Sequence, residues 1–275
     1  MDDPHRATAP PAPAGAAAEQ KWPQTLWVVR HGQSSGNVAR DAAEAAGLAD
    51  ITIAERDVDV PLSPLGERQS DALGRWFVAL PPEQRPTVLL ASPYLRARQT
   101  AERVRAAIAA AGGDGAAPEM TLDERLREKE FGILDRLTRN GIRARYPELA
   151  EQRGHVGKFY FRPPGGESWC DVILRLRSFI EMVTREHRRE RVLVVAHQVI
   201  VNCLRYLLER LDEAAILAID RVADVPNCSV TSYEFDPAAG RRGKLVLRQA
   251  SFVLPLEEAG APVTSAPDKP AAAKP

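Results

Sequence analysis

The feature that most limits the fold is a set of four short apolar runs, separated by longer segments with helical patterns. The runs lie at 25–29, 87–91, 191–196 and 230–235. Short runs that are apolar throughout are typical of strands buried on both faces of a sheet. Strands that alternate with helices are joined by right-handed crossovers and run mostly parallel. The sequence therefore predicts an α/β fold with three layers, in which helices cover both faces of a mostly parallel central sheet.

Serine caps mark the expected helix starts. Ser63 and Ser92 are each followed by a proline, which suits an N-cap and the first helical position. Ser168 and Asp171 have the spacing of a capping box. We therefore expect helices over 64–79, from 93 to about 111, from 169 through 183, and over about 199–211.

The chain has no internal repeat and no long Pro/Gly linker, so we expect one domain over 23–255. The Ala- and Pro-rich ends, 1–22 and 256–275, predict a disordered N-terminal arm and a disordered C-terminal tail. The less regular stretch 112–166 is expected to form a small cap over the sheet. An insertion at 41–58 is expected to form a helix and a loop near the site.

The balance of charge restricts the partners of the chain. Its 275 residues include 37 basic and 37 acidic side chains, so the formal net charge is zero. A nucleic-acid partner would require a basic surplus, whereas a small anionic substrate needs only a local cluster of positive charge. We therefore expect a small-molecule substrate and no nucleic acid, and the composition is compatible with a homodimer.

The expected location is the cytoplasm. No apolar run approaches the roughly 18 residues that span a bilayer, and the N-terminus lacks the layout of a secretory signal. Cys170, Cys203 and Cys228 are scattered, which favours reduced thiols over a disulfide framework. Since no metal-ligand spacing is present, we expect no metal and no other cofactor.

Polar side chains follow three of the predicted strands. Arg30 and His31 follow the first run, Arg96 comes shortly after the second, and His197 directly follows the third. Ligands bind outside the carboxyl ends of strands in parallel sheets, so we expect these four side chains to face one crevice. Two arginines and two histidines repel one another unless an anion lies between them, and guanidinium groups match the oxygens of phosphate. The sequence therefore predicts a phosphate site.

Four ordered motifs carry a family resemblance. They are RHGQSSGN (30–37), SPYLRARQTA (92–101), LREKEFG (126–132) and VLVVAHQ (192–198). In order and residue type they resemble the motifs of the histidine phosphatase superfamily, often called phosphoglycerate mutase-like. The resemblance covers most of 25–235 and implies a mixed, mostly parallel α/β sheet.

The resemblance implies a role for each matching residue. His31 would be the nucleophile that becomes a phosphohistidine, and Glu128 the acid that protonates the leaving oxygen. The phosphate pocket would comprise Arg30, Arg96, His197, Asn37 and Gln198. A neutral imidazole can approach a phosphate without charge repulsion, and positioned cations can stabilise the transition state without a metal ion.

Three of these residues also have a simpler structural interpretation. Arg96 could be an ordinary ion-pair partner, and Asn37 could cap a helix. Glu128 lies in a charged run over 123–130, and such runs are usually solvated faces.

Residues 126–236 resemble most the bisphosphatase domain of the bifunctional fructose-2,6-bisphosphate enzymes. In that branch, residues that match Arg153 and Lys158 hold the sugar phosphate. Arg139 and Trp169 stand where those enzymes carry tyrosines, which argues against a fructose bisphosphate substrate. The basic side chains of the cap still suit a second anionic group on the substrate.

We therefore expect a metal-independent phosphomonoesterase that acts on a small phosphorylated metabolite through a phosphohistidine. One alternative is a cofactor-dependent phosphoglycerate mutase, which needs a lid to shield the phosphohistidine from water. The Ala- and Pro-rich tail argues against it, because such a tail is not expected to pack tightly. The second alternative is a phospho-ligand-binding protein without catalysis, which is disfavoured because every catalytic position is filled.

Overall fold

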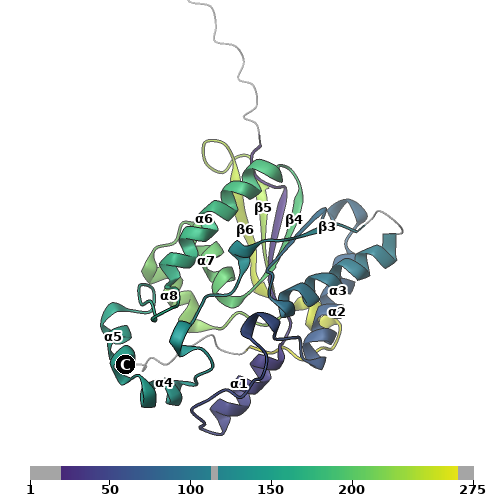
Figure 1. Ribbon diagram of the computed structural model, residues 1–275. Coiled ribbons are helices and arrows are strands. Elements are labelled where there is room, and N and C mark those ends of the chain that lie inside the picture. The colour runs from purple at the N-terminus through teal and green to yellow at the C-terminus, as the bar shows by residue number, and fades with distance from the viewer. Residues whose placement is uncertain (1–19, 113–116, 266–275) are drawn as a thin grey trace, which may run out of the picture.

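The computed structural model describes residues 20–112 and 117–265. Within them lies a six-stranded sheet with the order β3-β2-β4-β1-β5-β6 (Figure 1). Its strands are β1 (Thr25–Arg30), β2 (Val88–Ala91), β3 (Glu119–Leu122), β4 (Arg191–Ala196), β5 (Val230–Asp236) and β6 (Lys244–Phe252). Strands β1 to β4 run parallel, whereas β5 pairs antiparallel with β1 and β6. The predicted α/β fold is confirmed.

The four predicted strands are all present, and β3 and β6 are additional. Both additional strands lie at the edges of the sheet, where burial is incomplete. In β6 the sequence KLVLRQASF mixes apolar residues with exposed polar ones. An edge strand of this kind lacks the continuous apolar run that identified the central strands, which explains why the sequence did not predict it.

Helices cover both faces of the sheet (Figure 1). One face carries α6 (Trp169–Glu186), α7 (Gln198–Glu209) and α8 (Glu213–Val222), and the other carries α2 (Pro64–Ala79) and α3 (Leu95–Gly112). Side chains of β1 alternate between them: Leu26 and Val28 belong to the core under α6 and α7, and Trp27 and Val29 to the core under α2 and α3. The alternation follows from the two-residue period of a strand.

Two of the three predicted helix caps are present. Ser63 accepts a hydrogen bond from the backbone of Gly66 at the start of α2, and Ser168 and Asp171 form the predicted capping box of α6. Ser92 does not cap α3, which begins later, at Leu95. Its hydroxyl lies 2.8 Å from Nε2 of His197 instead. This serine therefore contributes to the site rather than to the helix end.

The cap and the insertion lie against each other. The insertion is the end of α1 (Ser35–Ala45) and a loop that closes with η1 (Asp57–Asp59), and the cap comprises η3 (Glu124–Leu126), η4 (Gly132–Leu134), α4 (Arg139–Arg145) and α5 (Pro147–Val156). A short turn, η2 (Pro82–Gln84), precedes β2. The cap has its own small core of Leu134, Ile142 and Phe161. A β-bridge between Asp50 and Leu137 joins the insertion to it.

The C-terminal segment differs from the prediction of a disordered tail that starts at residue 256. Residues 254–258 form α9 (Leu254–Glu258), and Leu256 is fully buried in the core under α2 and α3. Farther along, the carbonyl oxygen of Pro262 accepts a hydrogen bond from Gln69 at 2.8 Å. One buried leucine thus anchors a segment whose composition suggested disorder. The rest of that tail, and nearly all of the predicted N-terminal arm, lie outside the described residues.

None of the helices in the described part of the chain is long and apolar enough to cross a membrane.

Candidate active site

The carboxyl ends of β1, β2 and β4 meet at one edge of the sheet, as predicted. A pocket at this edge is lined by Arg30, His31, Arg96 and Glu128. The first turn of α1, the loop before α2 and the cap complete its wall. The parallel arrangement therefore gathers Arg30, His31 and Arg96 from two motifs, and Glu128 joins them from the cap.

A contact of His31 defines which of its two ring nitrogens carries the proton. Its Nδ1 lies 2.6 Å from the carbonyl oxygen of Gly32. A carbonyl can only accept, so Nδ1 carries the proton and Nε2 keeps its lone pair. Burial, together with the charges of Arg96 and Arg30, holds the pKa of His31 well below its usual value. The ring is therefore neutral near pH 7, as a nucleophile requires.

The loop of His31 is held by close packing and hydrogen bonds. A Cβ on Gly32 would lie 2.5 Å from the carbonyl oxygen of Gly66, so the motif needs glycine here. The backbone nitrogen of Gly32 donates to the hydroxyl of Thr100 at 3.1 Å. The carbonyl oxygen of His31 accepts from the side-chain amide of Asn227 at 2.9 Å. These contacts fix the backbone on both sides of the imidazole.

His197 packs against His31, is completely buried, and is not among the described residues that line the pocket. The two ring centroids are 5.1 Å apart. Nδ1 of His197 makes no hydrogen bond to any described residue, and Oε2 of Glu128 stands 3.9 Å from it. Burial, followed by the charge of Arg96, lowers the pKa of His197 well below its usual value. A buried nitrogen in this position is suited to contact an anion or an acid at the floor of the pocket.

Arg30 is fixed from behind by Gln198. Nη1 of Arg30 donates to Oε1 of Gln198 at 2.8 Å, and Nε2 of Gln198 donates to Asp224 at 3.1 Å. The same Nη1 also donates to the carbonyl oxygen of Val225. Gln198 is absent from the pocket wall formed by the described residues. The side chain of Gln198 is thus engaged with Arg30, and its contact with phosphate stays a prediction.

The position of Arg96 agrees with both interpretations from the sequence, as a pocket residue and as an ion-pair partner. It lines the pocket, and it also forms an ion pair with Asp57 of η1, in which Nη1 lies 3.1 Å from Oδ1. Its guanidinium carbon lies 4.9 Å from the centroid of the Tyr94 ring. The side chain is thus held between an aromatic ring and a carboxylate while it faces the pocket.

Glu128 is the carboxylate of its charged run that faces the pocket. Its Oε1 accepts from the backbone of Lys129 at 2.8 Å. Neighbouring Glu130 accepts instead from the hydroxyl of Tyr94 at 2.9 Å. Neither Glu124 nor Glu130 lines the pocket, within the residues that the structure describes.

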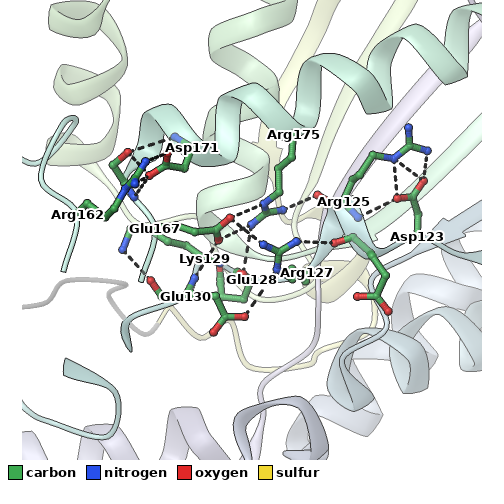
Figure 2. A network of polar contacts seen from close by, with 12 residues as sticks. Asp123, Arg125, Arg127, Glu128, Lys129, Glu130, Arg162, Glu167, Asp171 and Arg175 are labelled. Carbon is green, nitrogen blue, oxygen red and sulfur yellow. Dashed lines mark hydrogen bonds and ion pairs between the residues drawn. The ribbon is translucent and has the colours of Figure 1, made fainter. Parts of the chain in front are cut away.

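A network of partly buried polar groups holds the segment that carries Glu128 (Figure 2). Arg175 of α6 donates to the backbone oxygen of Glu128 at 3.3 Å, to that of Arg125, and to Glu167 at 2.9 Å. Burial alone would raise the pKa of Glu167, but the hydrogen bonds and charge of Arg175, with Arg127, keep that pKa below its usual value. Glu167 is therefore ionised and neutralises Arg175 behind the segment.

Asn37 combines the two roles considered from the sequence. Its Oδ1 accepts from the backbone of Ser34 at 3.0 Å and completes a capping box at the start of α1. It also lines the pocket with Ser34 and Gly36. The positive end of the α1 dipole thus points at the same pocket as the arginines.

The three predicted cap residues are not all brought together. Arg153 and Lys158 line a second pocket with Lys129, and Phe131 lies on the walls of both pockets. Arg139, the first residue of α4, lines neither pocket among those described. The tyrosine-to-arginine departure at this position therefore places the charge outside the site.

Four charged residues of the first pocket were not predicted. They are Arg40, Asp57, Asp135 and Arg136. Arg40 lies on α1, Asp57 begins η1, and Asp135 and Arg136 follow η4. No strand end marks them, and none lies in the four motifs. The insertion that contains Asp57 was expected near the site, but its length alone did not identify the residue that reaches Arg96. Among the described residues there is no group of three or more His, Cys, Asp or Glu side chains that could hold a metal ion.

Comparison with known families agrees with this geometry. The model of the histidine phosphatase superfamily (branch 1) matches residues 26–246. The chain belongs to this superfamily. The two catalytic-type histidines, both arginines and Glu128 all lie inside the matched region.

Two curated relatives of this histidine phosphatase have names that state different activities. This chain is 30% identical over 192 residues to a 6-phosphofructo-2-kinase/fructose-2,6-bisphosphatase of Caenorhabditis elegans, a match that covers 68% of this chain and 35% of that protein. The chain thus spans about a third of that relative's length. It is also 30% identical over 205 residues to a 2,3-bisphosphoglycerate-dependent phosphoglycerate mutase of Methylobacterium sp. (strain 4-46), covering 73% of this chain and 88% of the mutase.

Solved structures share the fold. A mycobacterial glucosyl-3-phosphoglycerate phosphatase, in complex with VO3, aligns with a TM-score of 0.61 at 24% identity over 82% of this chain and 98% of that one. YhfR of Bacillus stearothermophilus aligns with a TM-score of 0.61 at 26% identity over 82% of this chain and 98% of that one.

Proposed function

We propose that this histidine phosphatase is a phosphomonoesterase that passes the phosphoryl group through His31. The observation that carries the proposal is the tautomer of His31, which leaves Nε2 free to attack in a pocket lined by Arg30 and Arg96. In the first step Nε2 bonds to phosphorus as the ester P–O bond breaks, and Glu128 gives a proton to the leaving oxygen. In the second step water attacks phosphorus, the P–N bond breaks, and Glu128 takes the proton of the water.

The charges around His31 suit this reaction. Phosphoryl transfer spreads negative charge over the oxygens of the transferred group, and fixed donors lower the barrier most. Arg30 and Arg96 are buried and held by protein contacts, so they need little reorganisation. We infer that these two arginines, with the N-terminus of α1, bind the phosphoryl oxygens.

Transfer through His31 is tested by trapping. Purified wild type is mixed with a panel of ³²P-labelled sugar phosphates and phosphoglycerates without added metal, and quenched in alkali, which preserves phosphohistidine. We expect label on the protein and release of phosphate. His31→Ala should lose both, whereas the control His155→Ala, an exposed residue of α5, should retain both. Hydrolysis by His31→Ala at the wild-type rate would overturn the proposal.

A phosphoglycerate mutase is the second candidate. One observation removes the argument against it: the segment that follows β6 is packed at the back of the site loop, whereas the sequence had suggested a loose tail. The similarity to a mutase over 88% of that enzyme's length agrees. Incubation with 3-phosphoglycerate and catalytic 2,3-bisphosphoglycerate separates the two activities. Rapid formation of 2-phosphoglycerate without inorganic phosphate would establish the mutase and exclude the phosphomonoesterase.

We further propose that the second pocket binds a second anionic group of the substrate. Lys129 and Arg153 provide positive charge there, Lys158 lines the pocket while paired with Asp220 at 2.6 Å, and Phe131 adjoins both pockets. Arg153→Met should raise KM several-fold for bisphosphorylated substrates and leave KM for monophosphorylated ones unchanged. Arg139→Met is the matched control, since Arg139 lines neither described pocket. Equal effects of Arg153→Met on both substrate types would contradict this assignment.

The cytoplasm is our proposed location. All three cysteines are free thiols, and two of them are buried, as expected in a reducing compartment. Cell fractionation with an antibody to the chain tests this. Recovery in the culture medium or from an extracytoplasmic fraction would contradict the proposal.

A further inference from the structure

The guanidinium of Arg96 already has an anionic partner inside the pocket. Nη1 donates to the main-chain oxygen of Asp57 at 2.6 Å and to Oδ1 at 3.1 Å, and Nη2 lies 3.4 Å from Oδ2. The side chain of Arg96 is 7% exposed and that of Asp57 is 44% exposed. The cation is therefore buried, whereas the acid stands on the pocket wall with access to solvent.

The backbone around Asp57 is anchored to the cap. Arg136 donates to the carbonyl oxygens of Ile53 and Glu55, at 3.1 Å and 2.7 Å. The backbone nitrogen of Ile51 donates to the carbonyl oxygen of Arg136 at 2.8 Å. These contacts tie the loop before η1 to the segment after η4. The carboxylate is thus presented to Arg96 by a tethered loop rather than by a free chain segment.

A phosphoryl group and this carboxylate compete for the same donors. An arginine offers a planar fork that binds one carboxylate or one phosphate in a bidentate manner. When a phosphate dianion enters, it meets the charge of Asp57 a few ångströms away, in a partly buried site where water screens weakly. The carboxylate has solvent beside it, so it can leave the fork by rotation of its side chain.

We propose that Asp57 is a specificity-determining residue that competes with the phosphoryl group for Arg96. The competition weakens binding of ligands that offer only a phosphate, inorganic phosphate above all, and so favours release of the product. A full substrate has further contacts in the pocket that offset this cost. The inference rests on the proposed role of Arg96 in binding phosphoryl oxygens.

Equilibrium binding of inorganic phosphate to the full chain tests the competition. Calorimetry would compare wild type, Asp57→Asn, Asp57→Ala and Arg96→Ala. Asp59→Asn is the matched control, because Asp59 lies in the same turn but pairs with Arg56 at 2.6 Å on the surface. Removing one like charge should tighten phosphate binding about 5- to 50-fold in both Asp57 variants. Asp59→Asn should bind phosphate as the wild type does.

The outcomes separate this inference from the proposed function. If both Asp57 variants keep a wild-type melting curve and bind phosphate no more tightly, while Arg96→Ala binds it weakly, Asp57 does not compete and the phosphate site stands. If Arg96→Ala binds phosphate as the wild type does, the phosphate site itself is wrong. Two Asp57 variants are used so that a folding defect in one leaves the other to decide.

Discussion

The hydroxyl of Thr264 donates a hydrogen bond to Oδ1 of Asn227 at 3.0 Å, and this contact continues to the candidate nucleophile. Nδ2 of Asn227 donates to the backbone oxygen of His31 at 2.9 Å. Gln69 connects Thr264 to the same loop a second time. Its Nε2 donates to Thr264 at 2.9 Å, and its Oε1 accepts from the backbone of Gln33 at 2.9 Å. The segment after α9 therefore supports the His31 loop from behind.

We expect Thr264→Val to lower kcat several-fold, because Gln69 and Asn227 each lose a buried hydrogen-bond partner and the His31 loop loses support. The loss of two neutral hydrogen bonds should also reduce the free energy of unfolding by about 1–3 kcal/mol. Steady-state kinetics and urea denaturation measure the two effects. Thr264→Ser, which keeps the hydroxyl, should restore kcat.

Ser265→Ala is the control for that experiment, since Ser265 is exposed and adjacent. A Thr264→Val enzyme that loses stability but keeps wild-type kcat, in the folded fraction, would show that the segment has no positioning role.

The acid role of Glu128 predicts a dependence on the leaving group. Glu128→Gln should lower kcat for alkyl phosphates by about 10²–10⁴, because a positioned proton donor contributes that much. With p-nitrophenyl phosphate, whose leaving group needs no proton, the rate of phosphohistidine formation should change little, whereas the second step, in which Glu128 is the base, slows equally for both substrates. Glu130→Gln serves as the control, since that carboxylate bonds to Tyr94 and lies outside the pocket wall of the described residues. Equal slowing of phosphohistidine formation from both substrates, measured in a single turnover, would assign the acid elsewhere.

The two buried histidines predict how stability varies with pH. The pKa values of His31 and His197 are lowered in the folded chain, by burial first and then by arginine charge. Histidines in the unfolded chain have a pKa of about 6.5, so below that pH the unfolded chain binds protons that the folded chain does not. The free energy of unfolding should therefore fall as pH decreases from about 6.5, by at most about 1.4 kcal/mol per pH unit for each histidine. Above that pH neither histidine contributes a slope.

Urea midpoints at about pH 7.5, 6.5 and 5.5 measure this slope at a range where most carboxylates remain ionised. The double variant His31→Asn/His197→Asn should be less sensitive to pH than the wild type. His155→Gln should behave as the wild type, because His155 is exposed. A double variant with an unchanged slope would mean that the buried histidines are protonated in the folded chain.

How far the sequence could predict the site depends on where each contact originates. His31, Arg96 and His197 follow strands whose apolar runs are visible, and the geometry of a parallel sheet then brings them together. Asp57 and Thr264 have no such signal. Their partners, Arg96 and Asn227, lie 39 and 37 residues away along the chain, and neither contact produces a periodic pattern.

The cap shows the same limit. Its basic residues suggested one site. Arg153 on α5 lines the second pocket, whereas Arg139 on α4 lines neither described pocket. The C-terminal segment was predicted to be disordered from its Ala and Pro content, which is an average over the whole segment. The single buried Leu256 decides where it packs. Composition is a weak guide wherever one side chain sets the position.

The contacts of Arg175 in the network of Figure 2 predict that this residue positions Glu128. Nη2 of Arg175 donates to the backbone oxygen of Glu128 at 3.3 Å, and its Nε donates to Glu167 at 2.9 Å. Arg175→Met should lower the free energy of unfolding by about 1–3 kcal/mol, since Glu167 is partly buried and keeps Arg127 as a partner. Because Glu128 is then held less firmly, the rate of phosphohistidine formation from alkyl phosphates should fall about tenfold, with little change for p-nitrophenyl phosphate.

The control for Arg175→Met is Arg177→Met, an exposed position on the same helix, which should behave as the wild type in both assays. The leaving-group comparison distinguishes positioning from simple destabilisation, because a partly unfolded enzyme loses activity toward both substrates in equal proportion. Equal losses, measured at a temperature where Arg175→Met is folded, would limit Arg175 to a structural role. A loss of phosphohistidine formation confined to alkyl phosphates would show that α6 positions the proton donor, since Arg175 holds the segment of Glu128 by its backbone oxygens.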